Sequence, residues 1–184
     1  MNLIVAYCKN RGIGLKNNLP WKLSLDMNRF KKLTIGNKNN AVIMGRNTWE
    51  SLPSKYKPLP KRTNIILTTK ADYRSNTIDP NVPKFFSSFK SAEHYCSLAQ
   101  IDNIWVIGGE MIYNEVLQYE HLQRIYVTHI DKEYECDTFF PEIPDDFELE
   151  LETKWFSEND IKFKYETYLA KQPNYEEEVY SLAL

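Results

Sequence analysis

Short apolar runs that end in glycine or polar turns are the feature of this sequence that most limits its fold. A continuous apolar run of this length is typical of a strand that is buried on both faces of a sheet. Segments with helical periodicity separate the runs, so we expect parallel strands joined by right-handed crossovers. The expected strands cover residues 3–7, 41–44, 64–67, 104–107 and 124–130, and the expected helices cover residues 24–33, 91–99 and 111–117.

The end of the chain has a different pattern. Residues 147–156 and 161–169 are long extended segments, separated by the polar stretch 157–160. In the second segment, more polar neighbours alternate with Ile161, Phe163, Tyr165, Thr167 and Leu169. This alternation predicts an antiparallel hairpin with one better-buried face. The sequence therefore predicts a single α/β domain whose mostly parallel sheet has an antiparallel edge.

Composition narrows the class of protein. The chain has 184 residues and a formal net charge of -2, so no basic excess indicates nucleic acid or an anionic membrane as a partner. Its three cysteines, Cys8, Cys96 and Cys136, form no C-x-x-C pair, and we expect neither a disulfide framework nor a metal site. The N-terminal residues lack a signal-peptide pattern, and no apolar run approaches the roughly 20 residues that span a bilayer. We therefore expect a cytoplasmic protein.

The adjacent glycines Gly108 and Gly109 stand between an apolar strand and a helical pattern. Glycine lets a backbone pass close to another group, and the N–H groups of a helix start stabilise an anion. A tight turn without a ligand and a phosphate site both fit this pattern. The G-x-G-x-x-G motif of an ordinary Rossmann domain is absent, because Gly12 and Gly14 supply only its first half, in a long loop.

Two further polar turns, residues 45–48 and 68–70, also follow apolar strands. The carboxyl ends of parallel strands meet at one edge of a sheet, where ligands bind in folds of this kind. Arg46, beside the N–H groups of a helix start, suits a phosphate that arginine can bind through two hydrogen bonds. Each turn alone is more often simply solvated, but the three turns together favour an extended polyphosphate such as a dinucleotide.

The helix expected from Ser24 carries a carboxylate among apolar side chains. Ser24 is its expected N-cap. Asp26, Phe30 and Leu33 are spaced i, i+4 and i+7 and so share one stripe of the helix. Asp26 could interact with the start of its own helix, or it could be a buried carboxylate kept for a polar ligand. In the second case burial would raise the pKa of Asp26, and a cationic or donor ligand would lower it.

These residues resemble those of the dihydrofolate reductase family, with its motifs in the same order over residues 2–170. The motifs are Leu19-Pro-Trp21, Asp26 with Phe30, Val42-Ile-Met-Gly-Arg46 with Thr48-Trp49, Pro58-Leu-Pro-Lys-Arg62, Ile107-Gly-Gly109 with Tyr113, Thr128, and Asp137-Thr-Phe-Phe-Pro141. The resemblance implies a domain over residues 1–171 with an eight-stranded, mostly parallel mixed sheet and helices on both faces. It also implies NADPH-dependent reduction of 7,8-dihydrofolate to tetrahydrofolate, which supports thymidylate synthesis.

The resemblance also implies the substrate contacts. Asp26 matches the carboxylate that binds the pterin, Thr128 the hydroxyl that supports it, and Trp21 the tryptophan that orders a nearby water. Arg62 matches the arginine that pairs with the carboxylate of the glutamate tail. The remaining substrate positions are Ile4, Val5, Met27, Phe30, Leu52, Leu59, Ile107 and Tyr113.

The positions that match NADPH contacts form a second set. They are Ala6, Ile13, Gly14, Leu19, Gly45, Arg46, Asn47, Thr48, Leu67, Thr68, Thr69, Gly108, Gly109, Glu110, Met111 and Ile112. In this family the Gly-Gly peptide bond is cis. Where the family often has a basic residue near the adenosine, this chain has Asn47 or Thr69, and Lys70 could substitute.

The implied partners are dihydrofolate and antifolates such as methotrexate, and the implied state is a monomer. Residues 172–184 form an expected tail whose short acidic stretch is similar to the start of thymidylate synthase, which follows this domain in some fused enzymes. Two alternatives remain open. A pyrimidine reductase of riboflavin synthesis shares the general fold but has no need of Arg62 or of Asp26 beside Phe30. A non-catalytic binding module would retain only the fold.

Overall fold

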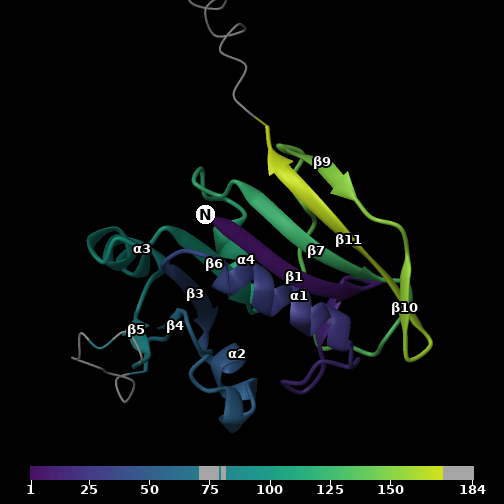
Figure 1. Ribbon diagram of the computed structural model, residues 1–184, viewed down its shortest axis with the longest axis horizontal. Helices are drawn as coiled ribbons and strands as arrows, with labels where there is room; N and C mark the ends of the chain where they lie inside the picture. Colours follow the sequence, from purple (N-terminus) through teal and green to yellow (C-terminus); the bar gives the residue numbers. More distant parts are fainter. Residues whose placement is uncertain (71–78, 80–81, 172–184) are drawn as a thin grey trace, which may run out of the picture.

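A nine-stranded sheet forms the centre of the structure (Figure 1), a computed structural model that describes residues 1–70, 79 and 82–171. The strand order is β10-β11-β7-β1-β6-β3-β4-β5, and β9 also pairs with β11. The strands are β1 (Asn2–Cys8), β3 (Asn40–Gly45), β4 (Thr63–Leu67), β5 (Lys84–Phe86), β6 (Asn103–Gly108), β7 (Arg124–Ile130), β9 (Phe147–Glu152), β10 (Phe156–Glu158) and β11 (Ile161–Ala170).

The interior of this sheet is parallel, and its C-terminal edge is antiparallel. Strands β7, β1, β6, β3, β4 and β5 pair in parallel, whereas β11 runs antiparallel to β7, β9 and β10. Ile43 in β3 and Ile65 in β4 are fully buried, as expected for strands covered on both faces. The predicted α/β class, with a mostly parallel sheet and an antiparallel hairpin, is confirmed.

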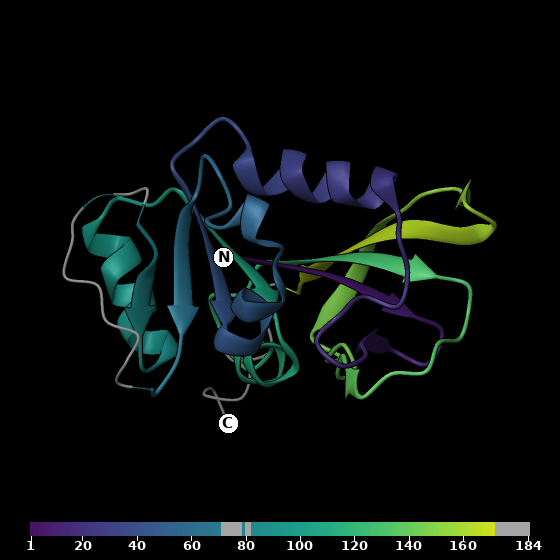
Figure 2. The ribbon, with the colours of Figure 1, turned by 90° about the horizontal axis from the view of Figure 1, so that it is seen from below.

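Two helices cover each face of the sheet. Figure 2 shows α1 (Ser24–Ile35) lying along one face, where α2 (Arg46–Ser51) also packs, followed by a short 3₁₀ helix, η1 (Ser54–Tyr56). Helices α3 (Phe89–Leu98) and α4 (Glu110–Val116) pack on the other face. Strand β1 therefore sends alternate side chains into two separate cores. None of the helices within the described residues is long and apolar enough to span a membrane.

The sheet has nine strands rather than the expected eight because the segment 147–156 is not one continuous strand. The backbone N–H of Thr153 donates to the carbonyl of Tyr165 (2.9 Å), but the N–H of Tyr165 donates to the Thr153 hydroxyl (3.0 Å). A side-chain oxygen thus takes the place of a ladder carbonyl, and the edge strand is divided into β9 and β10. Strands β9 and β10 both pair with β11 and together form one edge of the sheet. The nine strands therefore occupy eight places across the sheet.

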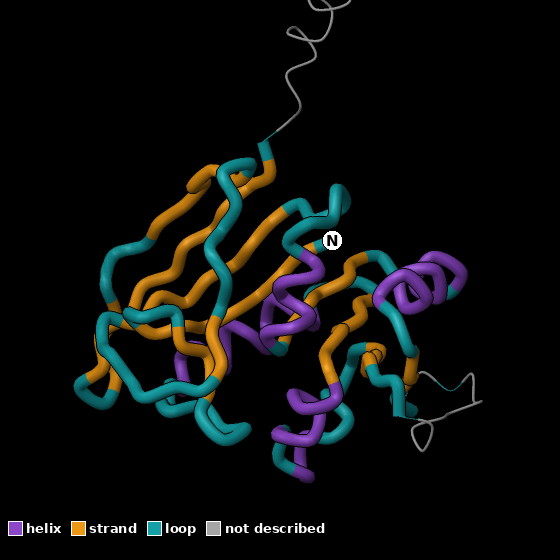
Figure 3. Tube along the Cα trace, turned by 180° about the vertical axis from the view of Figure 1, so that it is seen from behind, coloured by secondary structure: helices purple, strands orange, loops and turns teal. Residues whose placement is uncertain are grey.

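The long loops that follow β1 and β7 meet at one end of the sheet (Figure 3). The N–H of Lys9 donates to the carbonyl of Lys132 (3.0 Å), and the N–H of Phe140 donates to the carbonyl of Arg11 (2.8 Å). Between these bonds, β2 (Gly12–Gly14) pairs antiparallel with β8 (Thr138–Phe139). The expected tail, residues 172–184, lies outside the described residues.

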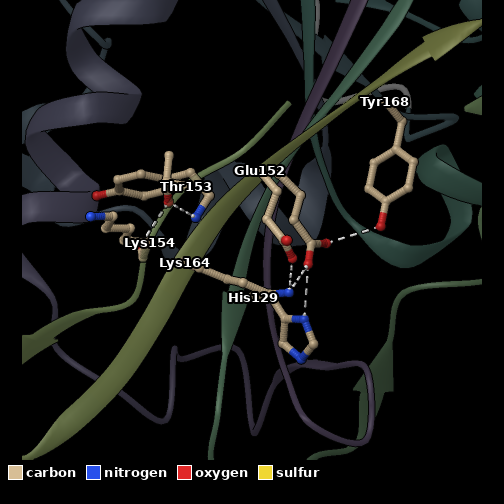
Figure 4. A network of polar contacts seen from close by, with 8 residues as sticks. His129, Glu152, Thr153, Lys154, Lys164 and Tyr168 are labelled. Atoms are coloured by element: carbon tan, nitrogen blue, oxygen red, sulfur yellow. Dashed lines mark hydrogen bonds and ion pairs between the residues drawn. The ribbon is translucent and has the colours of Figure 1, made fainter. Parts of the chain in front are cut away.

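A buried carboxylate on the sheet face opposite α1 links β7 to β11 (Figure 4). Glu166 accepts hydrogen bonds from Lys164 Nζ (2.9 Å) and Tyr168 Oη (3.0 Å), and it lies 3.3 Å from His129 Nδ1. Lys164 also contacts Glu152. Burial alone would raise the pKa of Glu166, but these bonds outweigh it and lower the pKa to about 2. Glu166 therefore stays ionised with its bonding capacity already used within the fold.

Candidate active site

Helix α1 begins at Ser24, and its N-terminus is capped from a distant part of the chain. The prediction that Ser24 is the N-cap is wrong, because Leu23 occupies that position and makes no side-chain cap. The carboxylate of Glu158 in β10 instead accepts the N–H groups of Ser24 (2.7 Å) and Leu25 (2.9 Å). These two backbone hydrogen bonds lower the pKa of Glu158, and the bond from Leu25 has the larger effect. The C-terminal hairpin thereby fixes the helix that carries Asp26.

Asp26 is bound to β7 across the space between helix and sheet. The Thr128 hydroxyl donates to Asp26 Oδ1 at 2.6 Å, and Thr128 pairs in register with Ala6 of β1. Burial raises the pKa of Asp26, while the Thr128 hydrogen bond and the charge of Arg29 oppose that rise. Asp26 Oδ2 accepts no hydrogen bond from the described residues. Unlike Glu166, Asp26 therefore retains an oxygen that can accept a donor from a ligand.

Arg29 is a partly buried cation one helical turn after Asp26, and the sequence motifs did not reveal it. Its guanidinium carbon lies 4.2 Å from the ring centre of Tyr165 and 5.9 Å from that of Tyr126. Its Nη1 atom is buried and has no hydrogen-bond partner among the described residues. Tyr165 pairs in register with Thr128, so Arg29 and Asp26 lie over the same part of the sheet. The i, i+3 spacing from Asp26 was the signal that could have identified Arg29.

Most of the predicted substrate positions gather in one apolar cluster beside Asp26. Ile4 and Leu59 are buried there, and Phe30, Leu52 and Ile107 pack against them. Met27 is 51% exposed, which leaves an apolar side chain available beside the carboxylate. Val5 differs, because its side chain packs into the core on the other face with Leu3 and Tyr7. Only its backbone can face the same ligand as Ile4.

Arg62 is a second buried guanidinium, at the far end of this cluster. It is 8% exposed, donates from Nη1 to the Thr34 hydroxyl (2.6 Å) and from Nε to the carbonyl of Pro60 (3.1 Å), and lies 5.7 Å from the Phe30 ring centre. No carboxylate of the described residues forms an ion pair with it. Burial lowers the pKa of Arg62 to about 10, so the charge remains and lacks a counterion within the site.

Gly108 and Gly109 join β6 to α4 through a cis peptide bond, as the resemblance implied. A Cβ atom on either glycine would approach the Thr48 hydroxyl, at 3.3 Å for Gly108 and 3.1 Å for Gly109. Thr48 is therefore the neighbour that leaves little room for a larger residue at either glycine, and the Tyr113 hydroxyl also lies close to Gly108. The Tyr113 hydroxyl donates to the carbonyl of Ile4 (2.9 Å), which ties α4 to the centre of β1.

Two helix starts lie side by side at this edge of the sheet. Helices α2 and α4 begin after Gly45 and Gly109, and neither has a side-chain cap. A Cβ atom on Gly45 would lie 3.8 Å from the Gly109 nitrogen, which shows how closely the two starts approach. Arg46 opens α2 and forms an ion pair with Glu50 (2.7 Å). The N–H groups of the two helix starts therefore lie close together, an arrangement that favours an anion.

The family assignment comes from comparison with known proteins. A family model described as dihydrofolate reductase matches residues 1–170. The chain belongs to this family. It is 38% identical to the dihydrofolate reductase of Aedes albopictus, over 91% of this chain and 95% of that protein. It is 40% identical to that of Heliothis virescens, over 78% of this chain and 80% of that protein. It is also 36% identical to the bifunctional dihydrofolate reductase-thymidylate synthase of Daucus carota, over 91% of this chain and 33% of that protein.

The remaining positions predicted from the resemblance to the dihydrofolate reductases lie on either side of the two helix starts. Ile112 approaches Gly45, and Met111 is 83% exposed at the start of α4 with Glu110. Leu67 ends β4 with its side chain in the core. Thr68, Thr69 and Asn47 offer polar groups nearer the surface.

The loop that contains the predicted NADPH positions Ile13, Gly14 and Leu19 has an anchored part and an exposed part. Ile13 packs against the core, and the Thr138 hydroxyl donates to the carbonyl of Gly14 (3.2 Å). Leu19 is 54% exposed, whereas Trp21 is buried with an indole N–H that has no partner among the described residues.

No group of three or more metal-ligating side chains occurs in the described residues. Glu158 and Arg29 are thus the members of this dihydrofolate reductase site that the family motifs did not include.

Replacing Arg29 with Met should raise the pKa of Asp26 further, because the guanidinium charge favours the ionised carboxylate. Carbon-13 NMR titration of the Asp26 carboxyl in the free protein measures this pKa directly. Arg29→Lys keeps the charge and should have a smaller effect, and Lys32→Met, at an exposed position of the same helix, should have none. An unchanged or lower Asp26 pKa in Arg29→Met would show that Arg29 does not act on this carboxylate.

Proposed function

We propose that the protein catalyses the NADPH-dependent reduction of 7,8-dihydrofolate to 5,6,7,8-tetrahydrofolate. The observation that carries the proposal is the half-buried Asp26, bound through one oxygen to Thr128 and open at the other. One edge of the pterin ring has two adjacent N–H donors, at N3 and the 2-amino group. A carboxylate accepts such a pair of donors well, and charge-assisted bonds of this kind are strong in a partly desolvated site.

The edge formed by the two helix starts supports the cofactor proposal. The uncapped N-termini of α2 and α4 suit the pyrophosphate, and Arg46 and Thr48 lie beside them. The bound NADPH supplies a hydride from C4 of its nicotinamide ring. Lys70, close to Thr68, is the cation proposed to favour NADPH over NADH, because its ammonium group can pair with the 2′-phosphate.

For hydride transfer the protein would have to hold the pterin and the nicotinamide ring face to face, close enough for the reacting carbons to meet. Ala6 lies between the two sites, since it follows Ile4 on the same face of β1 and pairs in register with Thr128. Ile13 and Leu19 belong to the loop proposed to cover the nicotinamide side and exclude bulk water. The strand β1 thus aligns substrate and cofactor through its backbone and its alternate side chains.

A proton must also reach N5 of the pterin. Asp26 binds the opposite edge of the ring, so it acts by polarising the ring and increasing the basicity of N5. The Trp21 indole N–H, buried and without a partner among the described residues, is suited to hold a water near the carboxylate. That water is the proposed immediate proton donor. Burial raises the pKa of Asp26, and the Thr128 hydrogen bond followed by the charge of Arg29 opposes that rise.

The function is tested by NADPH oxidation that depends on added dihydrofolate and stops with methotrexate. Asp26→Asn should lower the rate of hydride transfer at neutral pH by about 100-fold or more, because the charge that polarises the pterin is lost. Asp145→Asn changes an exposed carboxylate and serves as the matched control. Near-full hydride transfer in Asp26→Asn would disprove this role, and no dihydrofolate-dependent oxidation in the native protein would refute the function itself.

Arg62→Ala should weaken binding of glutamate-bearing folates by about 10- to 100-fold, since a charge-assisted hydrogen bond contributes about 1.5–3 kcal/mol. Equilibrium fluorescence titration gives the dissociation constants. A diaminopyrimidine without a glutamate tail is the control ligand, because it has no carboxylate for Arg62 and should bind the variant normally. Equal losses for both ligands would mean that Arg62 acts through the fold, and unchanged constants would rule out the contact.

A further inference from the structure

Cys8 and Cys136 are brought together by the fold although 128 residues separate them in the sequence. Cys8 ends β1 and is fully buried, whereas Cys136 is partly exposed in the irregular segment before β8. Their sulfur atoms lie 3.9 Å apart, and both thiols are free. The Cys8 thiol also donates to Asn10 Oδ1 (2.8 Å). The sequence argument against a disulfide framework rested on number and spacing, and it could not reveal this contact.

Gly12 makes room for the two thiols. A Cβ atom at this position would clash with the Cys136 sulfur and would lie 3.0 Å from the Cys8 sulfur. Gly12 opens β2, the strand that leads into the loop proposed to close over the cofactor. A residue with a side chain here would separate the cysteines, so the glycine and the facing thiols form a single arrangement.

The two cysteines lie where this loop is attached to the rest of the fold. The N–H of Asp137 donates to the carbonyl of Gly14 (3.0 Å), and Asp137 Oδ2 accepts the N–H of Lys16 (2.8 Å). The segment that contains Cys136 therefore holds the loop through non-covalent contacts, these hydrogen bonds among them, next to the end of β1. A covalent bond between Cys8 and Cys136 would fasten that segment to the central sheet.

We propose that Cys8 and Cys136 are a redox modification site, which forms a reversible intramolecular disulfide by exchange with a low-molecular-weight disulfide. The Cys136 thiolate attacks the small disulfide and releases one small thiolate. The Cys8 thiolate then attacks the Cys136 sulfur and releases the second. The two protons from the cysteines pass to the two released thiolates, so the protein is oxidised by two electrons and the small disulfide is reduced.

The geometry sets the order and the speed of these steps. Cys136 reacts first because Cys8 is buried. The sulfur atoms must then approach from 3.9 Å to about 2.05 Å, and Cys136 can adjust because it lies outside any helix or strand. Burial, followed by the neighbouring Cys8, raises the pKa of Cys136 to about 11. Oxidation should therefore be slow at neutral pH and accelerate by up to about tenfold per pH unit between pH 7 and 9.

The test is to incubate the purified protein with oxidised glutathione and then determine its mass and its free thiols after denaturation. The expected product is lighter by two hydrogen atoms, and its free thiols fall from three to one. Reduction should restore all three. A product that retains three thiols, or that carries only bound glutathione, would overturn the proposal.

Single variants keep this test specific. Cys96→Ser removes the buried cysteine of α3 and should still form the disulfide. Cys136→Ser, at a partly exposed position, and Cys8→Ser should each lose it. Hydrogen exchange at residues 13–16 gives a readout that does not depend on any enzymatic reaction. Exchange should be slower in the oxidised native protein than in the reduced protein, and equal exchange would show that the bond does not fasten the loop.

Discussion

The hydrogen bond from Thr128 to Asp26 is the contact on which the site depends. It joins α1 to β7 at the point where the helix presents the half-buried carboxylate of Asp26 to the sheet. Burial of a carboxylate is costly without partners, and this one has a single hydroxyl donor and a nearby guanidinium. The fold therefore retains at this position an acceptor that a ligand can complete. Glu166 is buried more deeply than Asp26, yet Lys164, Tyr168 and His129 already occupy its oxygens, so burial alone does not make a site.

The surroundings of this contact are held by elements far apart in the sequence. Glu158 on the C-terminal hairpin caps the helix that carries Asp26, and Tyr165 on the next strand lies against Arg29. The antiparallel edge thus does more than complete the sheet, because it orients the helix that carries the carboxylate. At the other edge of the site, the Tyr113 bond to Ile4 couples α4 to β1. The predicted substrate positions and the predicted cofactor positions are in this way both held against one central strand, β1.

Local patterns were sufficient for the central strands and for helices α1, α3 and α4, since apolar runs and helical periodicity depend only on neighbouring residues. The short strands β2, β5 and β8 were not predicted, because two or three residues carry too little pattern. The Asp26 stripe and the Gly108–Gly109 turn could also be recognised in the sequence. The Glu158 cap could not, because its signal lies 134 residues from Ser24. The division of the edge strand at Thr153 was likewise invisible, since it depends on which oxygen bonds Tyr165. The role of the glycine pair changed as well, because the group that approaches it within the fold is the Thr48 hydroxyl.

The central claim is that the pterin and the nicotinamide meet over β1, between Asp26 and the starts of α2 and α4. A crystal structure of the protein with NADP⁺ and folate tests it most directly. The account predicts that the Asp26 carboxylate accepts hydrogen bonds from the 2-amino and N3 groups of the pterin, with the nicotinamide against Ala6. A pterin bound away from Asp26, or a dinucleotide whose pyrophosphate lies away from Gly45 and Gly109, would contradict it.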